Sequence, residues 1–336
     1  MAMAGHLAVG WTDHPTDDEL EAVAALVTGV LRDAIPGERP YPASELAADL
    51  RHHRAYEEIR LGLATEGGRV VGAALLELDH SGSNRHLAWV QHLVVDPERR
   101  ALGTGRRLLD LVCDAVRADA RTTIVHDAPR DSEPATAFAE RAGATRGLVD
   151  HQNRLLVAGL DRPMLEGWVA RAAERAGGYS LVAFDGHCPD ELVDDFARLS
   201  AVMDTAPRTD VWEDTTVTAS MVRDSEAALR AKGGTTWTVC ARDDATGGLV
   251  GFTVIGFLPH RPWLAHQEDT GVEPAHRGRG LGRWLKATNA LRLLDERPEV
   301  EVVETWNAEV NAPMLSINHA MGFRRVAAWQ QWELPV

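Results

Sequence analysis

Cysteine is scarce in this sequence, with three residues in 336. They are widely spaced, odd in number and match no cysteine-based metal pattern, so neither a disulfide framework nor a bound metal is expected. We expect Cys113, Cys188 and Cys240 to be buried thiols in a reducing compartment, and therefore a cytoplasmic protein.

Long apolar runs and an excess of basic residues are also missing. No apolar stretch approaches membrane-spanning length, and Met1 to Trp11 lacks the basic region of a secretory signal. Lysine and arginine number 35 against 50 aspartate and glutamate, for a net charge of −15. Nucleic acid is therefore not expected as a principal partner, because phosphate backbones are bound by basic surfaces. The acidity suits a cationic acceptor such as an amine, or serves solubility alone.

The sequence does have the length and apolar content for two domains. Periodicity and turn residues predict similar orders of elements in its two halves. The first half has predicted strands at 7–12, 59–65, 69–78, 87–95, 122–126 and 150–157, and helices at 17–32, 44–56 and 132–141 and around 108–116. The second half has predicted strands at 179–184, 236–241, 249–257, 263–272, 300–305 and 326–334, and helices at 164–176, 189–202, 217–232 and 312–321 and after residue 280. Asp161-Arg162-Pro163 is the predicted boundary, which gives domains 1–160 and 161–336.

The stretch from Val272 to Lys286 carries the strongest chemical signal. It reads as the end of a strand, a tight turn and the start of an amphipathic helix. Its glycines, at 278, 280 and 282, allow positive φ and a close approach of the backbone to a ligand. The N–H groups and dipole at a helix start form an anion site. Arginines at 277, 279 and 283 add positive charge where a phosphate would lie.

The same pattern occurs in the first half. From Val95 to Gly105 the sequence repeats Val, Pro, Arg100, Gly103 and Gly105 at identical spacing. A Walker loop would need Gly-Lys-Ser/Thr, and a Rossmann fingerprint a third glycine, and neither is present. The Arg-x-x-Gly-x-Gly pattern after a Val-x-Pro strand end resembles the acyl-CoA pyrophosphate loop of the GNAT family of N-acetyltransferases.

This resemblance implies a mixed α/β fold made of two tandem GNAT-like domains, each a twisted mixed sheet flanked by helices. It also implies acetyl-CoA as co-substrate. The expected binding positions in the second copy are Val272, whose backbone N–H would meet the thioester carbonyl, with Arg277, Gly278, Arg279, Gly280, Leu281, Gly282 and Asn311. The corresponding positions in the first copy are Val95, Arg100, Gly103 and Gly105.

In GNAT-like domains the strand before the loop commonly carries the general base. Strand alternation predicts one face with His266, Glu268, Thr270 and Val272, and Gln267 and Asp269 on the other, although a β-bulge would change this division. Glu268 is the first candidate for the base, acting directly or through water, and His266 is the second; a solvated carboxylate and an exposed imidazole are the alternatives. Where the family often has a tyrosine as general acid, this chain has Asn318, which donates hydrogen bonds but does not readily supply a proton.

The first copy departs from the family pattern at these positions. Trp89 and Gln91 stand at the base positions, and Ser132 and Ala139 correspond to Asn311 and Asn318. We therefore expect the first domain to be non-catalytic and the second to be catalytic. In the second copy the resemblance places the acceptor near Met203 to Asp214, where acidic residues and Trp212 would hold an amine; a solvated loop is the equal alternative.

The sequence thus predicts an N-acetyltransferase that moves acetyl from acetyl-CoA to a primary amine of a small molecule by direct attack in a ternary complex. The protein would be a monomer or homodimer without nucleic-acid or membrane partners. Two alternatives are a non-enzymatic CoA-binding or regulatory module and an acyltransferase that uses a different acyl donor.

Overall fold

The computed structural model describes residues 6–336, without the side chains of Ala173 and Arg175. The chain forms two compact units. Unit 1 contains the chain up to Asp150 together with Thr209–Glu213 and Ala327–Val336, and unit 2 contains His151–Arg208 and Asp214–Val326. The units are described separately below.

Unit 1 contains a mixed sheet with the strand order β1-β2-β3-β4-β5-β12-β6. Its neighbouring strands are antiparallel from β1 to β4, β4 and β5 are parallel, and β5 and β12 are antiparallel. The strands are β1 (Leu7–Thr12), β2 (Glu57–Glu66), β3 (Arg69–Asp79), β4 (Leu87–Val95), β5 (Thr123–Pro129), the start of β6 (Thr145–Leu156) and most of β12 (Arg324–Pro335). The helices are α1 (Asp17–Ala34), α2 (Ala43–Arg51), α3 (Thr104–Ala118) and α4 (Glu133–Ala142).

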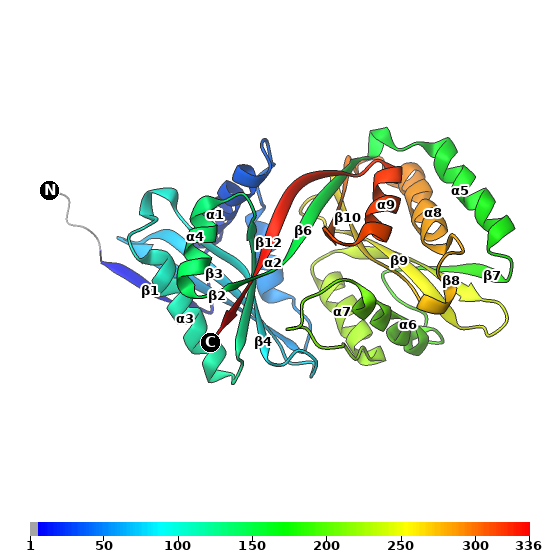
Figure 1. Cartoon of the computed structure of the whole chain (residues 1–336). Helices are drawn as coiled ribbons and strands as arrows, with labels where there is room; N and C mark the ends of the chain where they lie inside the picture. The colour runs from blue at the N-terminus through cyan, green and yellow to red at the C-terminus, as the bar shows by residue number, and fades with distance from the viewer. Residues whose placement is uncertain (1–5) are drawn as a thin grey trace. The chain divides into compact units, whose positions relative to one another are not determined.

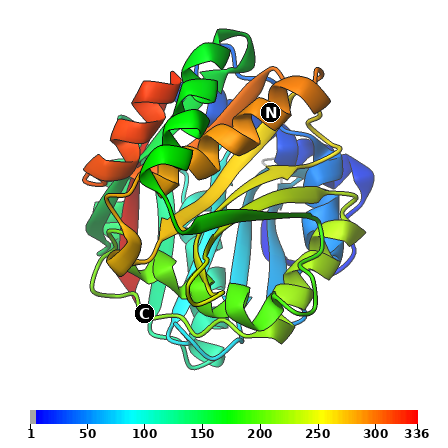
Figure 2. The ribbon, with the colours of Figure 1, turned by 90° about the vertical axis from the view of Figure 1, so that its right-hand side faces the viewer.

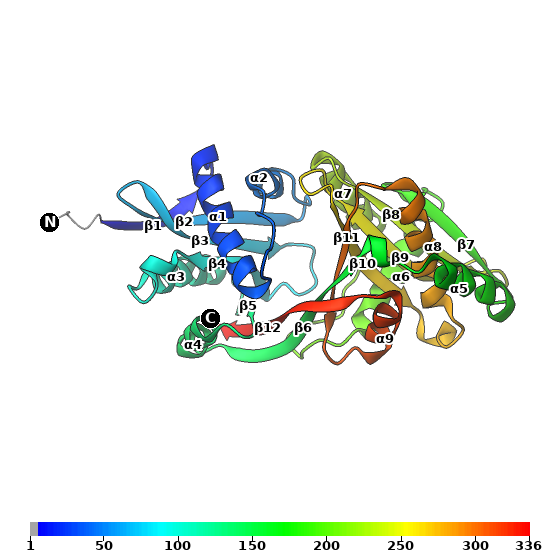
Figure 3. The same ribbon diagram turned by 90° about the horizontal axis from the view of Figure 1, so that it is seen from above.

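Helices cover both faces of the unit 1 sheet (Figure 3). Thr16 and Glu19 form a capping box that begins α1, which packs with α2 against one face of β2 and β3. On the opposite face, α3 inserts Leu108, Val112 and Val116, each fully buried. These two apolar layers fix the position of the loop between β4 and α3.

Unit 2 has the strand order β6-β11-β10-β9-β8-β7. Its strands are the end of β6, β7 (Tyr179–Asp185), β8 (Thr235–Asp243), β9 (Leu249–Phe257), β10 (Leu264–Val272) and β11 (Val302–Ala308). Its helices are α5 (Arg162–Arg175), α6 (Val193–Ser200), α7 (Ala219–Ala231), α8 (Leu281–Glu296) and α9 (Ala312–Met321). Figure 2 shows α5, α8 and α9 on one side of the strands and α6 and α7 on the other. The predicted mixed sheets with flanking helices are confirmed.

The closing strands differ from the sequence prediction. We expected β12 to complete the second sheet, but Trp329–Pro335 pairs with Pro129–Thr123 of β5 in unit 1, and β12 lies beside β6 (Figure 1). The end of β6, expected in the first domain, lies next to β11 in unit 2. The units therefore differ from the expected ranges 1–160 and 161–336. Alternation predicts a strand but does not specify which free sheet edge the strand joins.

The cysteines and the apolar character of the helices were also considered in the sequence. Cys113, Cys188 and Cys240 are free and buried, as predicted. Over the described residues, none of the helices combines the length and the apolar character that a membrane crossing requires.

Candidate active site

The glycine- and arginine-rich turn of unit 2 joins β10 to α8. A short 3-10 helix, Pro274–His276, follows β10, and Gly280 is the N-cap of α8 with φ 85°. Gly278 also has positive φ, at 77°. A Cβ built at Gly278 or Gly280 meets nothing within 4 Å, so both backbones border open space. No side chain caps α8, which leaves the N–H groups of its first turn for an anion.

Three arginines surround this helix start. Arg277 Nε donates to the Val272 carbonyl at 2.8 Å and its Nη2 donates to Thr205 Oγ1 at 2.6 Å, which fixes the turn to the end of β10. The Arg279 and Arg283 guanidinium groups lie 5.6 and 5.2 Å from the ring centroids of Tyr179 and Trp168. In the described part of the chain neither of these two has a carboxylate partner, so their charge stays uncompensated near the turn. The residues present fit the pyrophosphate of an acyl-CoA.

β10 and β11 diverge beside this turn. They pair in parallel only where Leu264–His266 meets Val302–Glu304. Beyond that, the Gln267 carbonyl accepts from the Thr305 hydroxyl at 2.9 Å. β10 also contains a β-bulge, because its pairing with β9 shifts register between Gln267 and Thr270. The separated strands and the bulge expose backbone polar groups at this point of the sheet.

The bulge changes the predicted faces of β10. Gln267 and Thr270, expected on opposite faces, lie together with Thr253: Thr253 Oγ1 is 2.7 Å from Thr270 Oγ1, and Gln267 Nε2 donates to Thr253 Oγ1 at 3.1 Å. The prediction that Thr270 shares a face with Glu268 is therefore wrong, because two bulge residues oppose one residue of β9. Glu268 and Asp269 are the exposed bulge residues.

Glu268 and His266 have different surroundings. Glu268 extends over β9, since a Cβ built at Gly256 would lie 3.2 Å from Glu268 Oε1. His266 pairs in register with Glu304 of β11. Burial, followed by the nearby Arg261 and Arg154 charges, lowers the pKa of His266 to about 4, against an opposing effect of Glu304. The imidazole is therefore neutral at pH 7, and it is too weak a base to hold a proton taken from an ammonium group at that pH.

Glu304 itself was not predicted from the sequence. It is buried and accepts from Arg154 Nε at 2.6 Å and Gln152 Nε2 at 2.8 Å, both on β6. These charge-assisted bonds keep the carboxylate in place beside His266. Only the pairing of β6 with β11 brings these residues together, and the sequence prediction had assigned β6 to the other sheet.

Asn311 lies at the start of α9, and Asn318 lies near the end of the same helix. Asn311 is the N-cap of α9, and its side chain accepts from the Met314 N–H at 3.4 Å. Asn318 is fully buried, and its Nδ2 donates to Asn307 Oδ1 at 2.8 Å. The Asn318 Oδ1 atom has no hydrogen-bond donor in the described chain.

The interior of unit 2 beneath α8 carries two further polar groups that the sequence prediction missed. Lys286 is 1% exposed, with its ammonium 5.7 Å from the Phe323 ring centroid, and Asn289 is fully buried. Burial lowers the pKa of Lys286 to about 7. Counted from the two glycine turns, the equivalent residues of unit 1 are Leu109 and Val112, so unit 1 is apolar where unit 2 is polar.

The turn of unit 1 has the same geometry with weaker anion-binding features. Gly103 is the N-cap of α3 with φ 90°, and Arg100 Nε donates to the Val95 carbonyl at 3.2 Å. Ala101, in place of Gly278, is held at φ 60°, a region that costs an L-residue about 1–2 kcal/mol. Leu102, which is 68% exposed, replaces Arg279.

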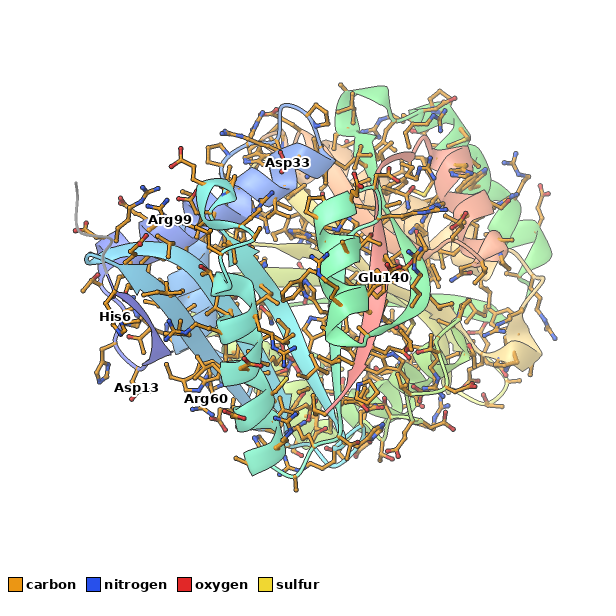
Figure 4. The ribbon with its side chains drawn as sticks, turned by 60° about the vertical axis from the view of Figure 1, so that its left-hand side comes forward. His6, Asp13, Asp33, Arg60, Arg99 and Glu140 are labelled. Atoms are coloured by element: carbon orange, nitrogen blue, oxygen red, sulfur yellow. The ribbon has the colours of Figure 1, made fainter. Side chains whose placement is uncertain are left out.

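Two arginines near the unit 1 turn, Arg99 and Arg106, pair with carboxylates. Arg99 Nε donates to Glu66 at 2.6 Å (Figure 4 labels Arg99), and Arg106, the counterpart of Arg283, donates to Asp110 at 2.8 Å. Gly105 follows the turn and packs near Phe138, since a built Cβ would lie 3.3 Å from that ring.

The base positions of unit 1 hold no carboxylate. Gln91 is the bulge residue of β4 and donates to Glu77 at 2.5 Å, and Trp89 lies 5.9 Å from Trp212. Burial, with a contribution from His126, lowers the pKa of His92 to about 4. Ser132 caps α4 as Asn311 caps α9.

The segment in which the acceptor was expected, Met203 to Asp214, is divided between the two units. Trp212 belongs to the Thr209–Glu213 segment of unit 1, where its ring contacts Trp89. Arg208 pairs with both Asp204 and Asp214, which compensates two acids expected to bind an amine. Sequence position alone assigned this segment to the second domain, whereas its contacts assign part of it to the first.

Comparisons with known proteins agree with this geometry. The sequence model of the "Acetyltransferase (GNAT) family" matches residues 30–144 and 199–323, more than half of the chain. The chain therefore belongs to the GNAT acetyltransferase family, and its fold and family define an N-acetyltransferase that takes its acyl group from an acyl-CoA.

Two solved structures share the fold over nearly the whole chain, and one of them is a tandem GNAT protein. A tandem GNAT protein from the clavulanic acid biosynthesis pathway is 27% identical, with a TM-score of 0.77 and 98% of each chain covered. A GCN5-related N-acetyltransferase from Sphaerobacter thermophilus shares the fold at 15% identity, with a TM-score of 0.70 over 98% of this chain and 95% of that one. No curated protein sequence matches the chain significantly.

Proposed function

We propose that unit 2 transfers acetyl from acetyl-CoA to a primary amine of a small molecule, by direct attack within a ternary complex in the cytoplasm. The observation that carries this proposal is the contrast between the two turns. Unit 2 has two glycines at positive φ and two arginines that have no carboxylate partner among the described residues. At the matching places, unit 1 has Ala101, Leu102 and an ion-paired arginine.

In this proposal the α8 N-terminus, Arg279 and Arg283 bind the pyrophosphate, and Asn311 orients the start of α9. Bound acetyl-CoA supplies an activated thioester. Glu268, directly or through a water, removes a proton from the acceptor ammonium, so that the free amine forms the C–N bond as the C–S bond breaks. His266, neutral and beside Glu304, orients groups near Glu268. The second proton of the attacking nitrogen passes to solvent as the amide forms. Buried Asn318 donates hydrogen bonds but no proton, so the departing thiolate takes its proton from solvent.

Two observations support a primary amine of a small molecule as the acceptor. The net charge of −15 favours cationic acceptors at long range. The tandem GNAT protein from the clavulanic acid biosynthesis pathway, at 27% identity, belongs to small-molecule biosynthesis. Tailoring or inactivating an amine-bearing natural product suits this chain.

Glu268→Gln tests the proposal, with Asp269→Asn as a matched control because both acids are exposed in the same bulge. Thiol release from acetyl-CoA is measured over a panel of primary amines that includes benzylamine, an aminosugar and an amino acid. For any amine that the wild type acetylates, we expect E268Q to lower kcat/KM by about 10²–10⁴, the usual contribution of a general base. Acetyl-CoA affinity should stay unchanged and D269N should retain activity within a few-fold. Equal losses in both variants would contradict the role of Glu268.

A further inference from the structure

Two buried side-chain oxygens in unit 1 face one another without a hydrogen-bond donor. Asp127 of β5 pairs in register with Gln331 of β12, so both side chains lie on one face of the sheet. Asp127 Oδ1 and Gln331 Oε1 are each buried and unpartnered, and Gln331 is 8% exposed. Buried acceptors normally have a donor, and its absence here points to a missing partner that supplies N–H or O–H groups.

Further acceptors surround this pair. A Cβ built at Gly147 of β6 would lie 2.8 Å from Gln331 Oε1 and 2.9 Å from Glu333 Oε1, so these two oxygens converge over the Gly147 backbone. Burial and the nearby Asp150 charge raise the pKa of Asp127 to about 7. Glu333 Oε1 accepts from the Thr209 hydroxyl at 2.5 Å, whereas Asp127 Oδ1 and Gln331 Oε1 have no donor among the described residues. The cluster therefore combines negative charge with a shortage of donors.

Aromatic rings border the same face. Trp89 of β4 pairs in register with Val125, which lies two residues before Asp127 and so points to the same side of β5. Trp212 covers Trp89 at 5.9 Å between ring centroids. Two adjacent indoles provide an apolar surface and a favourable field for a cation.

We propose that Asp127 and Gln331 form a binding site in unit 1 for an organic primary ammonium ion, with Trp89 and Trp212 along its carbon chain. A metal ion fits less well, because in residues 6–336 no three His, Cys, Asp or Glu side chains are grouped to hold one. The three hydrogens of an ammonium match acceptors on neighbouring strands. This site lies in unit 1 and does not depend on catalysis in unit 2.

The test is isothermal titration of the full chain with n-butylammonium chloride at pH 7, in two buffers of different ionisation enthalpy. We expect binding accompanied by proton release from Asp127. Asp127→Asn and Gln331→Met should each weaken binding at least about tenfold, since each removes a hydrogen bond to a charged group. Asp114→Asn, an exposed acid on α3, is the control and should leave binding unchanged.

Two further arms locate the bound ion. Tetramethylammonium carries the same charge without N–H groups and should bind at least about tenfold more weakly, because it makes no hydrogen bonds. Glu268→Gln removes the proposed base of unit 2 and should leave butylammonium binding intact. The proposal is overturned if E268Q abolishes binding, if tetramethylammonium binds equally well, or if only Mg²⁺ or Ca²⁺ binds. Absence of butylammonium binding would also overturn it, since a protonated Asp127 that donates to Gln331 would then satisfy both oxygens.

Discussion

Lys286 distinguishes the two copies most sharply at the residue scale. Lys286 follows Leu285, a residue of the apolar stripe of α8. The residue of unit 1 that corresponds to Lys286 is Leu109. A fully buried lysine is costly, and the cost appears as a pKa lowered to about 7. Sequence periodicity did not identify this residue, because lysines are almost never fully buried and the pattern is equally consistent with an exposed side chain.

Lys286→Met is expected to stabilise the protein in a pH-dependent way. Between the ordinary lysine pKa of 10.5 and the folded value of about 7, the unfolded chain binds a proton that the folded chain does not. The free energy of unfolding of the wild type therefore rises with pH across this range. Relative to wild type, K286M should be more stable at pH 7 by a few kcal/mol, and the difference should shrink toward pH 10.

Chemical denaturation at pH 7, 8, 9 and 10 measures this difference. Lys232→Met, at the end of α7, is the control and should give a difference that is nearly constant with pH. A pH-independent difference for K286M would contradict the buried, neutral amine.

At the element scale, the turn and the helix after it were the most predictable part of the site. The spacing of Gly278, Gly280 and Arg277 specified a turn with positive φ and a helix start, and the structure has both. The faces of β10 were not predictable beyond Gln267, because the bulge depends on pairing with β9. The neutralisation of Arg99 by Glu66 also needed the fold, since β2 and the turn are distant in sequence.

Arg279→Ala combined with Arg283→Ala should weaken acetyl-CoA binding by about tenfold, because two positive charges leave the helix N-terminus. Arg106→Ala, at the place in unit 1 that matches Arg283, should have little effect because Asp110 already compensates its charge. The affinities are measured by calorimetry at low and moderate salt. A loss with R106A equal to that of the double variant would contradict the assignment of the working turn to unit 2.

At the scale of the whole molecule, the last strand belongs to the sheet of the first half. Trp332 is 4% exposed and pairs with His126 of β5, with the Arg146 guanidinium 5.2 Å from its ring. Sequence patterns predicted the strand itself, the repeat and the fold of each copy. They did not predict which sheet edge the strand joins. β5 pairs in parallel with β4, and β11 pairs in parallel with β10, so the sequence pattern offers two equivalent strands next to which β12 could pair.

Trp332→Ala should therefore destabilise unit 1, by about 3–5 kcal/mol, the usual cost of truncating a buried tryptophan. Trp168→Ala, in the core of unit 2, is the matched variant. Limited proteolysis with mass spectrometry then identifies which unit opens first. Early cleavage within residues 6–150 is expected for W332A, and cleavage confined to residues 151–326 would show that β12 supports unit 2 instead.

The most direct test of the central claim is calorimetric titration of acetyl-CoA with wild type, Gly280→Glu and Gly103→Glu. Both glycines are helix N-caps at positive φ, so the two substitutions impose similar strain and the same added charge. We predict one binding site in the wild type, lost in G280E and retained in G103E. Loss of that site in G103E with retention in G280E, or no acetyl-CoA binding by the wild type, would contradict an acetyltransferase centred on unit 2.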